Sequence, residues 1–351
     1  MSKQIVYFTK YARNGASSRL RSYQYIDLLH KEPGLEVTVQ NLFSEVYIDK
    51  LYNNSSIKVE ALKGYFFRLL FLFKIFKYDK VVIEKELFPY FPAFFERLLS
   101  FFKIDYIVDY DDAIFHNYDQ HPNKWIRLFL KNKIKTVMQL ANCVTAGNEY
   151  LATYAINAGA KKVVVIPTVV DIERYDPKES YILKDKLTIG WVGTPKTIQL
   201  FQKSLQHILF EYEHNFKILT IGGKLDVVDV PYEFIIWTET NEVENIKKID
   251  VGIMPLLDSD FEKGKCGYKL IQYMACGIPV IASAVGVNCE IVTEGVNGFL
   301  VHSPNDWQKH INFFIQNPES IQTMGKQARE TILAKYTLQI QYPILKKLLE
   351  I

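Results

Sequence analysis

The chain has 351 residues, of which 48% are hydrophobic and 23% are charged, and its formal net charge is +3. This length exceeds what one hydrophobic core usually organises, so we expect two domains. The small net charge argues against a nucleic-acid partner. None of the four cysteines belongs to a C-x-x-C pair. This favours free thiols in a reducing compartment, and the cytoplasm is the expected location.

We expect neither a signal peptide nor a membrane-spanning segment, because residues 1–4 lead straight into a strand-like run and no stretch reaches eighteen uninterrupted apolar residues. The nearest candidate is residues 64–76, GYFFRLLFLFKIF, which Arg68 and Lys74 interrupt. The aromatic and cationic region from Lys63 to Lys80 fits either a helix lying on an anionic membrane surface or a core helix with snorkelling lysines. The first alternative would place the chain peripherally on the inner face of the membrane.

Strand and helix patterns alternate through the first half of the chain. Apolar runs predict strands at 4–9, 35–40, 81–83, 106–108, 142–146 and 163–166, and helical spacing predicts helices over 17–30, over 91–102 and after 147. This alternation predicts a parallel sheet with crossover helices. The loop that follows the first strand, ARNGASSRLR, contains Gly15 and Arg19 at the place where open α/β sheets bind ligands. Arg19 could approach a phosphate there or be a solvated residue at a helix start.

The alternation pauses at 168–186, which is polar, charged and aperiodic and predicts a linker between domains at 1–167 and 187–325. Strands at 188–192, 216–221, 234–237, 251–255, 280–282 and 298–301, with helices at 198–212, 243–248 and 268–275, then predict a second doubly wound sheet. Helical character continues from 306 to 349, and Pro343 is expected to kink or split it.

Acidic residues follow the strand at 106–108. Asp111 and Asp112 come at its carboxyl end, where they could belong to an active site or could cap a turn. A D-x-D pattern can also grip a divalent metal, but no second cluster of suitable spacing accompanies it, so we expect no metal site. His116 follows closely and is either a contact for an acceptor or a structural residue.

Residues 264–283, GKCGYKLIQYMACGIPVIAS, combine a basic loop, a short helix and a buried strand. Gly267 allows close approach of the backbone to a ligand, and a helix N-terminus offers N–H groups and partial positive charge. With Lys265 before the helix and Lys269 in its first turn, this element is suited to hold a phosphate. The alternative is an ordinary helix-to-strand connection with two solvated lysines.

The region from Val251 to Val301 resembles the signature of family 4 retaining glycosyltransferases, the group 1 enzymes. The similar residues are the ACGIPVIAS run, Gly286, Glu290-Ile291-Val292 and Gly298-Phe299-Leu300. The resemblance implies a GT-B fold, in which two Rossmann-like doubly wound domains face each other across a cleft and the C-terminal helices, here 326–351, cross back to the first domain. It implies sugar transfer from a nucleotide-sugar donor with retention of anomeric configuration, without an essential metal and without a cofactor.

Two family glutamates, which contact the donor sugar and the ribose, are replaced here by Gly264 and Gln272. Gln272 can still hydrogen-bond a ribose hydroxyl through its amide. Glu262 could stand in for the first glutamate if the loop is longer by two residues. The family's pyrophosphate-binding cations are reduced to Lys196, which makes Lys265 a candidate replacement.

The resulting hypothesis is a glycosyltransferase whose partners are a nucleotide sugar and a glycan or lipid-linked glycan acceptor, as in assembly of a bacterial-type surface polysaccharide. A catalytically silent, nucleotide-binding partner protein and a sugar-nucleotide epimerase on the same fold remain alternatives. Candidate catalytic residues are Asp111, Asp112, Lys196 and Lys265; donor-binding candidates are Gly15, Arg19, Gly193, Thr194, Cys266, Gly267, Tyr268, Lys269 and Gln272; acceptor-side candidates are His116, Glu86 and Asn148.

Overall fold

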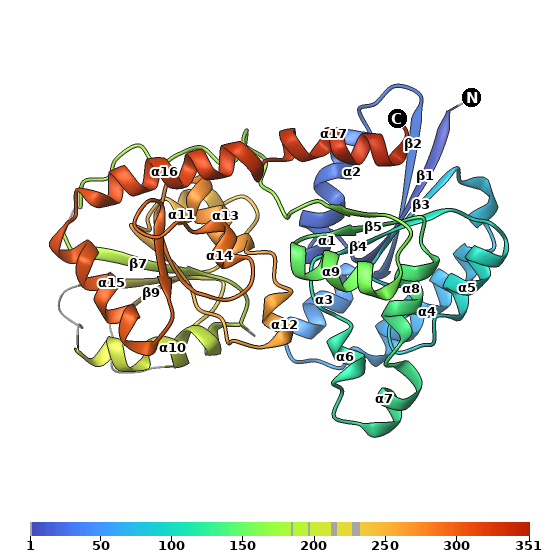
Figure 1. Ribbon diagram of the computed structural model, residues 1–351, viewed down its shortest axis with the longest axis horizontal. Helices are drawn as coiled ribbons and strands as arrows, with labels where there is room; N and C mark the ends of the chain where they lie inside the picture. The colour runs from blue at the N-terminus through green and yellow to red at the C-terminus, as the bar shows by residue number, and fades with distance from the viewer. Residues whose placement is uncertain (1, 184, 196, 212–215, 227–231) are drawn as a thin grey trace. The chain divides into compact units, whose positions relative to one another are not determined.

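The computed structural model describes residues 2–183, 185–195, 197–211, 216–226 and 232–351. The chain forms two compact units (Figure 1). Unit 1 comprises Met1–Thr168, Lys263–Cys266 and Ile344–Ile351, and unit 2 comprises Val169–Glu262 and Gly267–Pro343. Three separate parts of the chain therefore build unit 1.

Unit 1 contains a six-stranded sheet in the order β2-β1-β3-β4-β5-β6, and every neighbouring pair is parallel. The strands are β1 (Lys3–Tyr11), β2 (Leu35–Phe43), β3 (Lys80–Glu84), β4 (Tyr106–Tyr110), β5 (Cys143–Ala146) and β6 (Val163–Val165). Because all strands run the same way, the residues that follow β1, β3, β4 and β5 lie at one edge of the sheet.

The helices of unit 1 are mostly short. They are α1 (Ala16–Ser18), η1 (Arg19–Tyr23), α2 (Gln24–Leu29), α3 (Glu45–Tyr52), α4 (Lys58–Leu72), η2 (Ile75–Lys77), α5 (Phe94–Phe101), α6 (His116–Asp119), α7 (Lys124–Leu130), α8 (Lys133–Leu140) and α9 (Glu149–Ala158). The helix predicted over 17–30 contains a π-helical turn, η1, which buries Arg19 and Arg21. Such turns often occur at functional sites.

Helix α4 lies unusually close to the sheet of unit 1. A Cβ atom at Gly64 would stand 2.0 Å from the carbonyl oxygen of Leu42 in β2. The buried guanidinium of Arg68 donates to the Gln40 side chain at 2.7 Å and to the carbonyl of Leu87 at 3.0 Å. These donors satisfy carbonyl groups that burial would otherwise leave without partners.

Unit 2 repeats the architecture with a parallel sheet in the order β12-β11-β10-β7-β8-β9. Its strands are β7 (Leu187–Val192), β8 (Phe216–Ile221), β9 (Tyr232–Ile235), β10 (Val251–Met254), β11 (Val280–Ser283) and β12 (Gly298–Val301). Its helices are α10 (Ile198–Glu211), α11 (Glu242–Ile246), α12 (Asp260–Lys263), α13 (Tyr268–Ala275), α14 (Asn288–Ile291), α15 (Pro304–Gln316), α16 (Ser320–Lys335) and α17 (Leu338–Leu349), the last of which ends within unit 1.

Both faces of the unit 2 sheet are buried. Ile189 and Trp191 of β7 belong to one hydrophobic cluster, whereas the next residue, Val192, belongs to another. In the same way Ile281 of β11 lies in one cluster and its neighbours Val280 and Ala282 lie in the other. Since successive side chains of a strand point to opposite faces, helices cover both sides of this sheet. The predicted α/β fold of two doubly wound sheets is therefore confirmed.

The C-terminal region differs in detail from the sequence prediction. The stretch predicted as almost continuously helical consists of three helices, α15, α16 and α17, and Pro343 lies inside α17. The end of the chain returns to unit 1, as expected: Lys3 donates to the carbonyl of Leu349 at 2.8 Å, and Lys346 pairs with Glu32 at 2.7 Å. Among the described residues, no helix is both long and apolar enough to cross a membrane.

The close approach at Gly64 gives a test of the packing. Helix propensity alone favours Gly64→Ala by about 1 kcal/mol, but the new methyl group would meet the backbone of Leu42. Overpacking of this kind typically costs about 1–3 kcal/mol, so we expect Gly64→Ala to lower the free energy of unfolding, measured in urea. Lys63→Ala, at the adjacent exposed position, is the control and should change it by less than about 0.5 kcal/mol. A stabilised Gly64→Ala protein would contradict this packing.

Candidate active site

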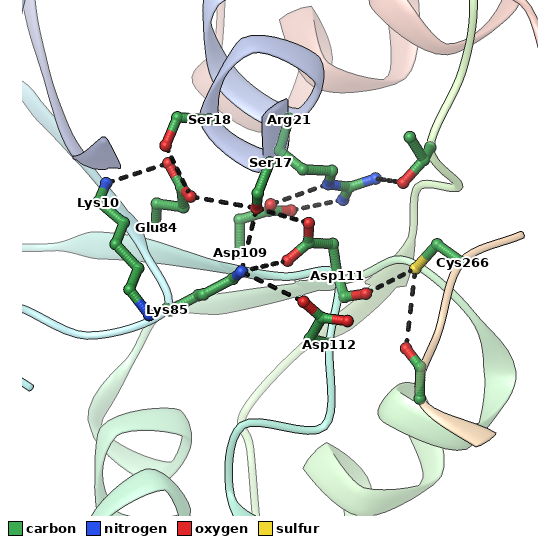
Figure 2. A network of polar contacts seen from close by, with 12 residues as sticks. Lys10, Ser17, Ser18, Arg21, Glu84, Lys85, Asp109, Asp111, Asp112 and Cys266 are labelled. Atoms are coloured by element: carbon green, nitrogen blue, oxygen red, sulfur yellow. Dashed lines mark hydrogen bonds and ion pairs between the residues drawn. The ribbon is translucent and has the colours of Figure 1, made fainter. Parts of the chain in front are cut away.

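A buried lysine connects three loops at the carboxyl edge of the unit 1 sheet (Figure 2). Lys85 follows β3 directly, and its φ of +67° is unusual for a residue with a side chain. Its amino group lies 2.7 Å from Asp111 Oδ1 and 3.6 Å from Asp112 Oδ2, and it donates to Ser17 Oγ at 3.0 Å. Ser17 Oγ in turn donates to Asp111 Oδ2 at 2.6 Å. The loops after β1, β3 and β4 therefore meet at one cation.

The charges in this cluster stabilise one another. Burial by itself would lower the pKa of Lys85, but Asp111, followed by Asp112 and Glu84, raises the pKa above its ordinary value. Burial would raise the pKa of Asp111, but Lys85, Arg21 and the Ser17 hydroxyl together hold it well below the usual range. Asp111 is therefore an ionised anchor and is poorly suited to act as a proton acceptor near neutral pH.

A second buried ion pair lies at the same edge. Arg21 of η1 donates to both carboxylate oxygens of Asp109, at 2.9 and 2.6 Å, and to the carbonyl of Ile166 at 2.7 Å. Thr145 of β5 donates to Asp109 at 2.5 Å. The bidentate geometry fixes the orientation of η1 against β4 and β5. Neither Arg21 nor Asp109 was among the candidates from the sequence. Both could have been included, because Arg21 belongs to the segment after the first strand and Asp109 lies near the end of β4.

Glu84 completes the network. Its carboxylate accepts from Ser18 Oγ at 2.9 Å and from the backbone N–H of Lys10 at 3.1 Å. Burial is the largest influence on Glu84 and raises its pKa, with Lys85 opposing it. Burial and then the charge of Lys85 lower the pKa of Lys10. At this edge Asp111 is thus strongly ionised, whereas Glu84 is more easily protonated than an ordinary glutamate.

The segment Lys263–Cys266 is seated against this network within unit 1. Cys266 Sγ donates to the carbonyl oxygen of Asp111 at 3.1 Å, and Lys265 Nζ lies 3.1 Å from Asp112 Oδ1. Asn148 donates to the carbonyl of Lys265 at 2.9 Å while its side-chain oxygen caps α9 by accepting from the N–H of Leu151 at 2.9 Å. Burial raises the pKa of the Cys266 thiol, so this cysteine is a packing residue.

Close packing against Ala113 explains why residue 264 is a glycine. A Cβ atom at this position would lie 2.5 Å from the Cβ of Ala113 and 2.6 Å from its backbone nitrogen. A glutamate side chain therefore does not fit at 264 unless the backbone moves. Glu262 lies in α12 of unit 2.

The remaining unit 1 candidates lie in different surroundings. Glu86 is buried, where Tyr118 donates to it at 2.7 Å and Lys133 forms an ion pair with it. His116 pairs with Asp119 at 2.9 Å and contacts the hydroxyl of Tyr150 at 3.0 Å.

The first loop contributes two more candidates. Gly15 packs against Tyr11, whose Cβ would lie 2.4 Å from a Cβ on the glycine. Arg19 is only 6% exposed within η1, so it is not a solvated residue at a helix start. Gly15 caps α1, which contains Ser17, and Arg19 begins η1 directly after α1.

In unit 2 the predicted phosphate-binding helix, α13, begins after Gly267, whose φ is +67°. Val192, at the end of β7, donates its backbone N–H to the hydroxyl of Tyr273 at 2.8 Å, which ties α13 to the carboxyl edge of the sheet. The Lys269 amino group lies 4.2 Å above the Trp191 ring, a favourable cation–π distance. A Cβ at Gly193 would meet the same indole at 2.4 Å.

The loop after β7 is only partly described. Thr194 N–H donates to Thr197 Oγ1 at 3.2 Å. The candidate Lys196 lies outside the described residues. At this edge of unit 2, the cation that the structure describes next to the end of β7 is Lys269, which lies over Trp191.

A buried polar cluster beside α13 was not anticipated from the sequence. Tyr175 donates to Glu242 at 2.6 Å, receives a hydrogen bond from Gln272 at 2.9 Å and contacts the hydroxyl of Tyr268 at 3.2 Å. Trp237 Nε1 donates to the other oxygen of Glu242 at 2.7 Å. Gln272 is 2% exposed and engages Tyr175 in this structure. Burial, the largest influence, raises the pKa of Tyr175 well above its ordinary value.

Among the described residues, no group of three or more histidine, cysteine, aspartate or glutamate side chains is arranged to hold a metal. All four cysteines are free thiols.

Residues 232–331, which include Glu242 and the whole of α13, match the family model of glycosyl transferases group 1. This part of the chain is similar to the group 1 glycosyltransferases. Relatives include an uncharacterised glycosyltransferase of Methanocaldococcus jannaschii, 41% identical over 66 residues, and spore coat protein SA of Bacillus subtilis, 36% identical over 61 residues. These matches span 18% and 16% of this chain and only 19% and 16% of the relatives' own length.

Solved structures are similar in fold to this chain over nearly its full length. Sucrose-phosphate synthase from Thermosynechococcus elongatus aligns over 99% of this chain and 98% of its own, with a TM-score of 0.72 and 16% identity. HepE of Anabaena in complex with UDP-glucose aligns over 99% and 100%, with a TM-score of 0.72 and 15% identity. The chain therefore has the GT-B fold.

The buried ion pair of Lys85 and Asp111 predicts a pH-dependent stability difference. Asp111→Asn leaves Lys85 buried beside a neutral partner, and removing one member of a buried pair costs about 3–5 kcal/mol. Because the folded-state pKa of Asp111 is depressed, its stabilisation is complete well above the ordinary aspartate pKa of about 4 and is lost as the pH falls toward the folded value. Urea unfolding between pH 7 and pH 3 should show a difference between wild type and variant that is constant above about pH 5 and shrinks below about pH 4.

The control for this prediction is Asp105→Asn, at an exposed position of unit 1. It should change the free energy of unfolding by less than about 0.5 kcal/mol at neutral pH. An Asp111→Asn protein as stable as wild type at pH 7 would show that Lys85 does not depend on this carboxylate.

Proposed function

We propose that this chain is a retaining glycosyltransferase that moves a sugar from a nucleotide-sugar donor to a glycan or lipid-linked glycan acceptor, without an essential metal. The observation that carries the proposal is the match of residues 232–331 to the group 1 family, since this region contains α13 and, from the polar cluster beside it, Trp237, Glu242 and Gln272. The similar structure of HepE holds UDP-glucose, and TarM, a further structural neighbour, has been solved with UDP and a GlcNAc-glycerol. These relatives make a UDP-sugar the first donor to test.

The donor's pyrophosphate is assigned to the start of α13. The first N–H groups of a helix and its partial positive charge favour an anion, and Gly267 lets the backbone approach one closely. Lys269 lies in the first turn and supplies a full charge. As the sugar–phosphate bond breaks, negative charge develops on the leaving nucleotide, and fixed donors aimed at that charge usually make the largest catalytic contribution.

Unit 1 is assigned the acceptor and the sugar's developing positive charge. Asp111 is buried and committed to Lys85 and Ser17, so it acts as an anchor. Asp112 has a side chain that is 24% exposed, and its two oxygens face Lys85 and Lys265. We therefore assign Asp112 and Lys265 to substrate contact. Lys265, which is close in sequence to the start of α13, contacts a donor phosphate, and Asp112 stabilises an oxocarbenium-like centre or accepts from an acceptor hydroxyl.

A silent, nucleotide-binding member of the family is the second candidate, and specific observations favour it. Gly264 leaves no room for the family carboxylate, and the Gln272 amide is occupied by Tyr175. In a silent protein these positions would serve packing, and nucleotide would bind at α13 without turnover.

A panel of UDP-, GDP- and dTDP-sugars separates the candidates. We expect slow hydrolysis of one donor in the absence of acceptor, followed by product of retained anomeric configuration, observed by NMR, when a glycan acceptor is supplied. Thermal stabilisation by a nucleotide with no turnover of any donor would support the silent binder. Inversion at C2 of the sugar would identify an epimerase and overturn the proposal.

Lys265→Ala tests the assignment of a cation. Losing a charge-assisted contact to phosphate should weaken donor affinity by about ten- to a hundredfold, measured by calorimetry, because such contacts contribute about 1.5–3 kcal/mol. Lys265→Arg should recover most of the affinity, and Lys161→Ala, at an exposed position of unit 1, should leave it unchanged. Unchanged affinity in Lys265→Ala would show that this lysine serves Asp112 alone.

A further inference from the structure

We propose that helices α4 and α5 of unit 1 form a docking surface for an anionic lipid bilayer, in which aromatic side chains enter the interface and lysines contact the headgroups. The surface comprises residues 58–77 and 91–103. Its exposed apolar side chains are Val59, Leu62, Phe66, Phe67, Leu69, Leu70, Phe73, Phe76, Phe91, Phe94, Phe101 and Phe102. This inference does not depend on the proposed transfer activity.

Helix α4 is apolar on two opposite sides. Its inner side packs on the sheet through Gly64, Arg68 and Phe71. Its outer side carries Leu62 and Phe66, and Phe73 continues the same side at the C-cap; Leu62 and Phe73 remain 73% and 77% exposed. A helix on the surface of a globular protein normally has a polar outer side, and one that is apolar all round is normally covered. The outer side of α4 therefore requires an apolar partner.

Helix α5 extends the same surface. Phe94 and Phe101 are exposed on α5, with Phe101 77% exposed. The ring of Phe102, directly after α5, lies 5.6 Å from the ring of Phe76 in η2. The apolar side chains of the two helices are thus continuous, and a contiguous exposed patch of this kind marks an interaction site.

The charges around the patch select the partner. Exposed basic residues occur throughout it, at Lys58, Lys63, Lys74, Lys77, Arg97 and Lys103. Within residues 58–77 and 91–103 the only carboxylates are Glu60 and Glu96. Glu60 is paired with Lys50 and Lys63, and Glu96 is buried, where it accepts from the N–H of Leu87. Aromatic and aliphatic side chains mixed with an excess of cations over carboxylates match a bilayer that contains acidic lipids.

Co-sedimentation of the full chain with vesicles tests the inference. Vesicles of phosphatidylcholine with 30% phosphatidylglycerol should bind the protein, pure phosphatidylcholine should bind it at least about tenfold more weakly, and 1 M salt should reduce binding to the acidic vesicles. No binding to acidic vesicles would overturn the proposal.

Two matched pairs of variants locate the surface. Leu62→Ser/Phe73→Ser should reduce vesicle partitioning at least about tenfold, whereas Ile156→Ser/Ile182→Ser, at exposed apolar positions elsewhere, should not change it. Lys74→Ser/Lys77→Ser should reduce it by a similar factor, and Lys161→Ser/Lys162→Ser should not. Circular dichroism checks that each variant is folded.

A second copy of the chain is the competing occupant. If the protein sediments as a dimer that Leu62→Ser/Phe73→Ser dissociates, and the wild type does not bind vesicles, the patch is a protein interface and the proposal is wrong. Equal loss of vesicle binding in the test and control variants would also overturn it.

Discussion

The buried amino group of Lys85 is the interaction on which the edge of unit 1 depends. A buried cation is costly unless it is paired and hydrogen-bonded, and here the loops after three strands supply Ser17, Asp111 and Asp112 for it. Since Asp112 also faces Lys265, the charge balance extends to a segment that lies far away in the sequence. These ion pairs therefore hold the loops in position, and under the proposed function they would supply electrostatic preorganisation.

The two units place different chemistry at their carboxyl edges. Unit 1 presents ion pairs built from Arg21, Lys85 and three aspartates. Unit 2 presents a helix start with Lys269 over Trp191, next to a hydroxyl and amide cluster around Glu242. The departures from the family pattern are part of these local structures, because Gly264 fits closely against Ala113 and Gln272 bonds Tyr175. Gly264 and Gln272 are therefore each part of the local packing, and the absence of a carboxylate at these positions is not an isolated change.

The fold followed from the sequence because strand and helix periods alternate clearly, and most predicted strands overlap the observed ones. The short helices α3, α6, α7 and α8 were not predicted, since few turns of helix give little periodic signal. The π-helical turn was also missed, because it depends on burying Arg19 and Arg21 against distant residues.

Part of the candidate site could be predicted from the sequence. Strand ends indicated Asp111 and Asp112, whereas Lys85 and Arg21 acquire their roles only through tertiary pairing. Tyr175 and Glu242 were missed for the same reason, since they are 67 residues apart in the chain and meet only after folding. Outward-facing aromatic residues on α4 resemble a core helix in sequence, and only the exposure of Leu62 and Phe73 separates the two interpretations.

Hydrogen–deuterium exchange with and without UDP tests most directly whether nucleotide binds at the start of α13. Saturating UDP should slow amide exchange at residues 267–272 and at residues 190–195, where Lys269 meets Trp191, while α15 should exchange at its original rate. Unchanged exchange at α13 with saturating UDP, GDP and dTDP, or protection confined to other regions, would contradict a donor site at this helix.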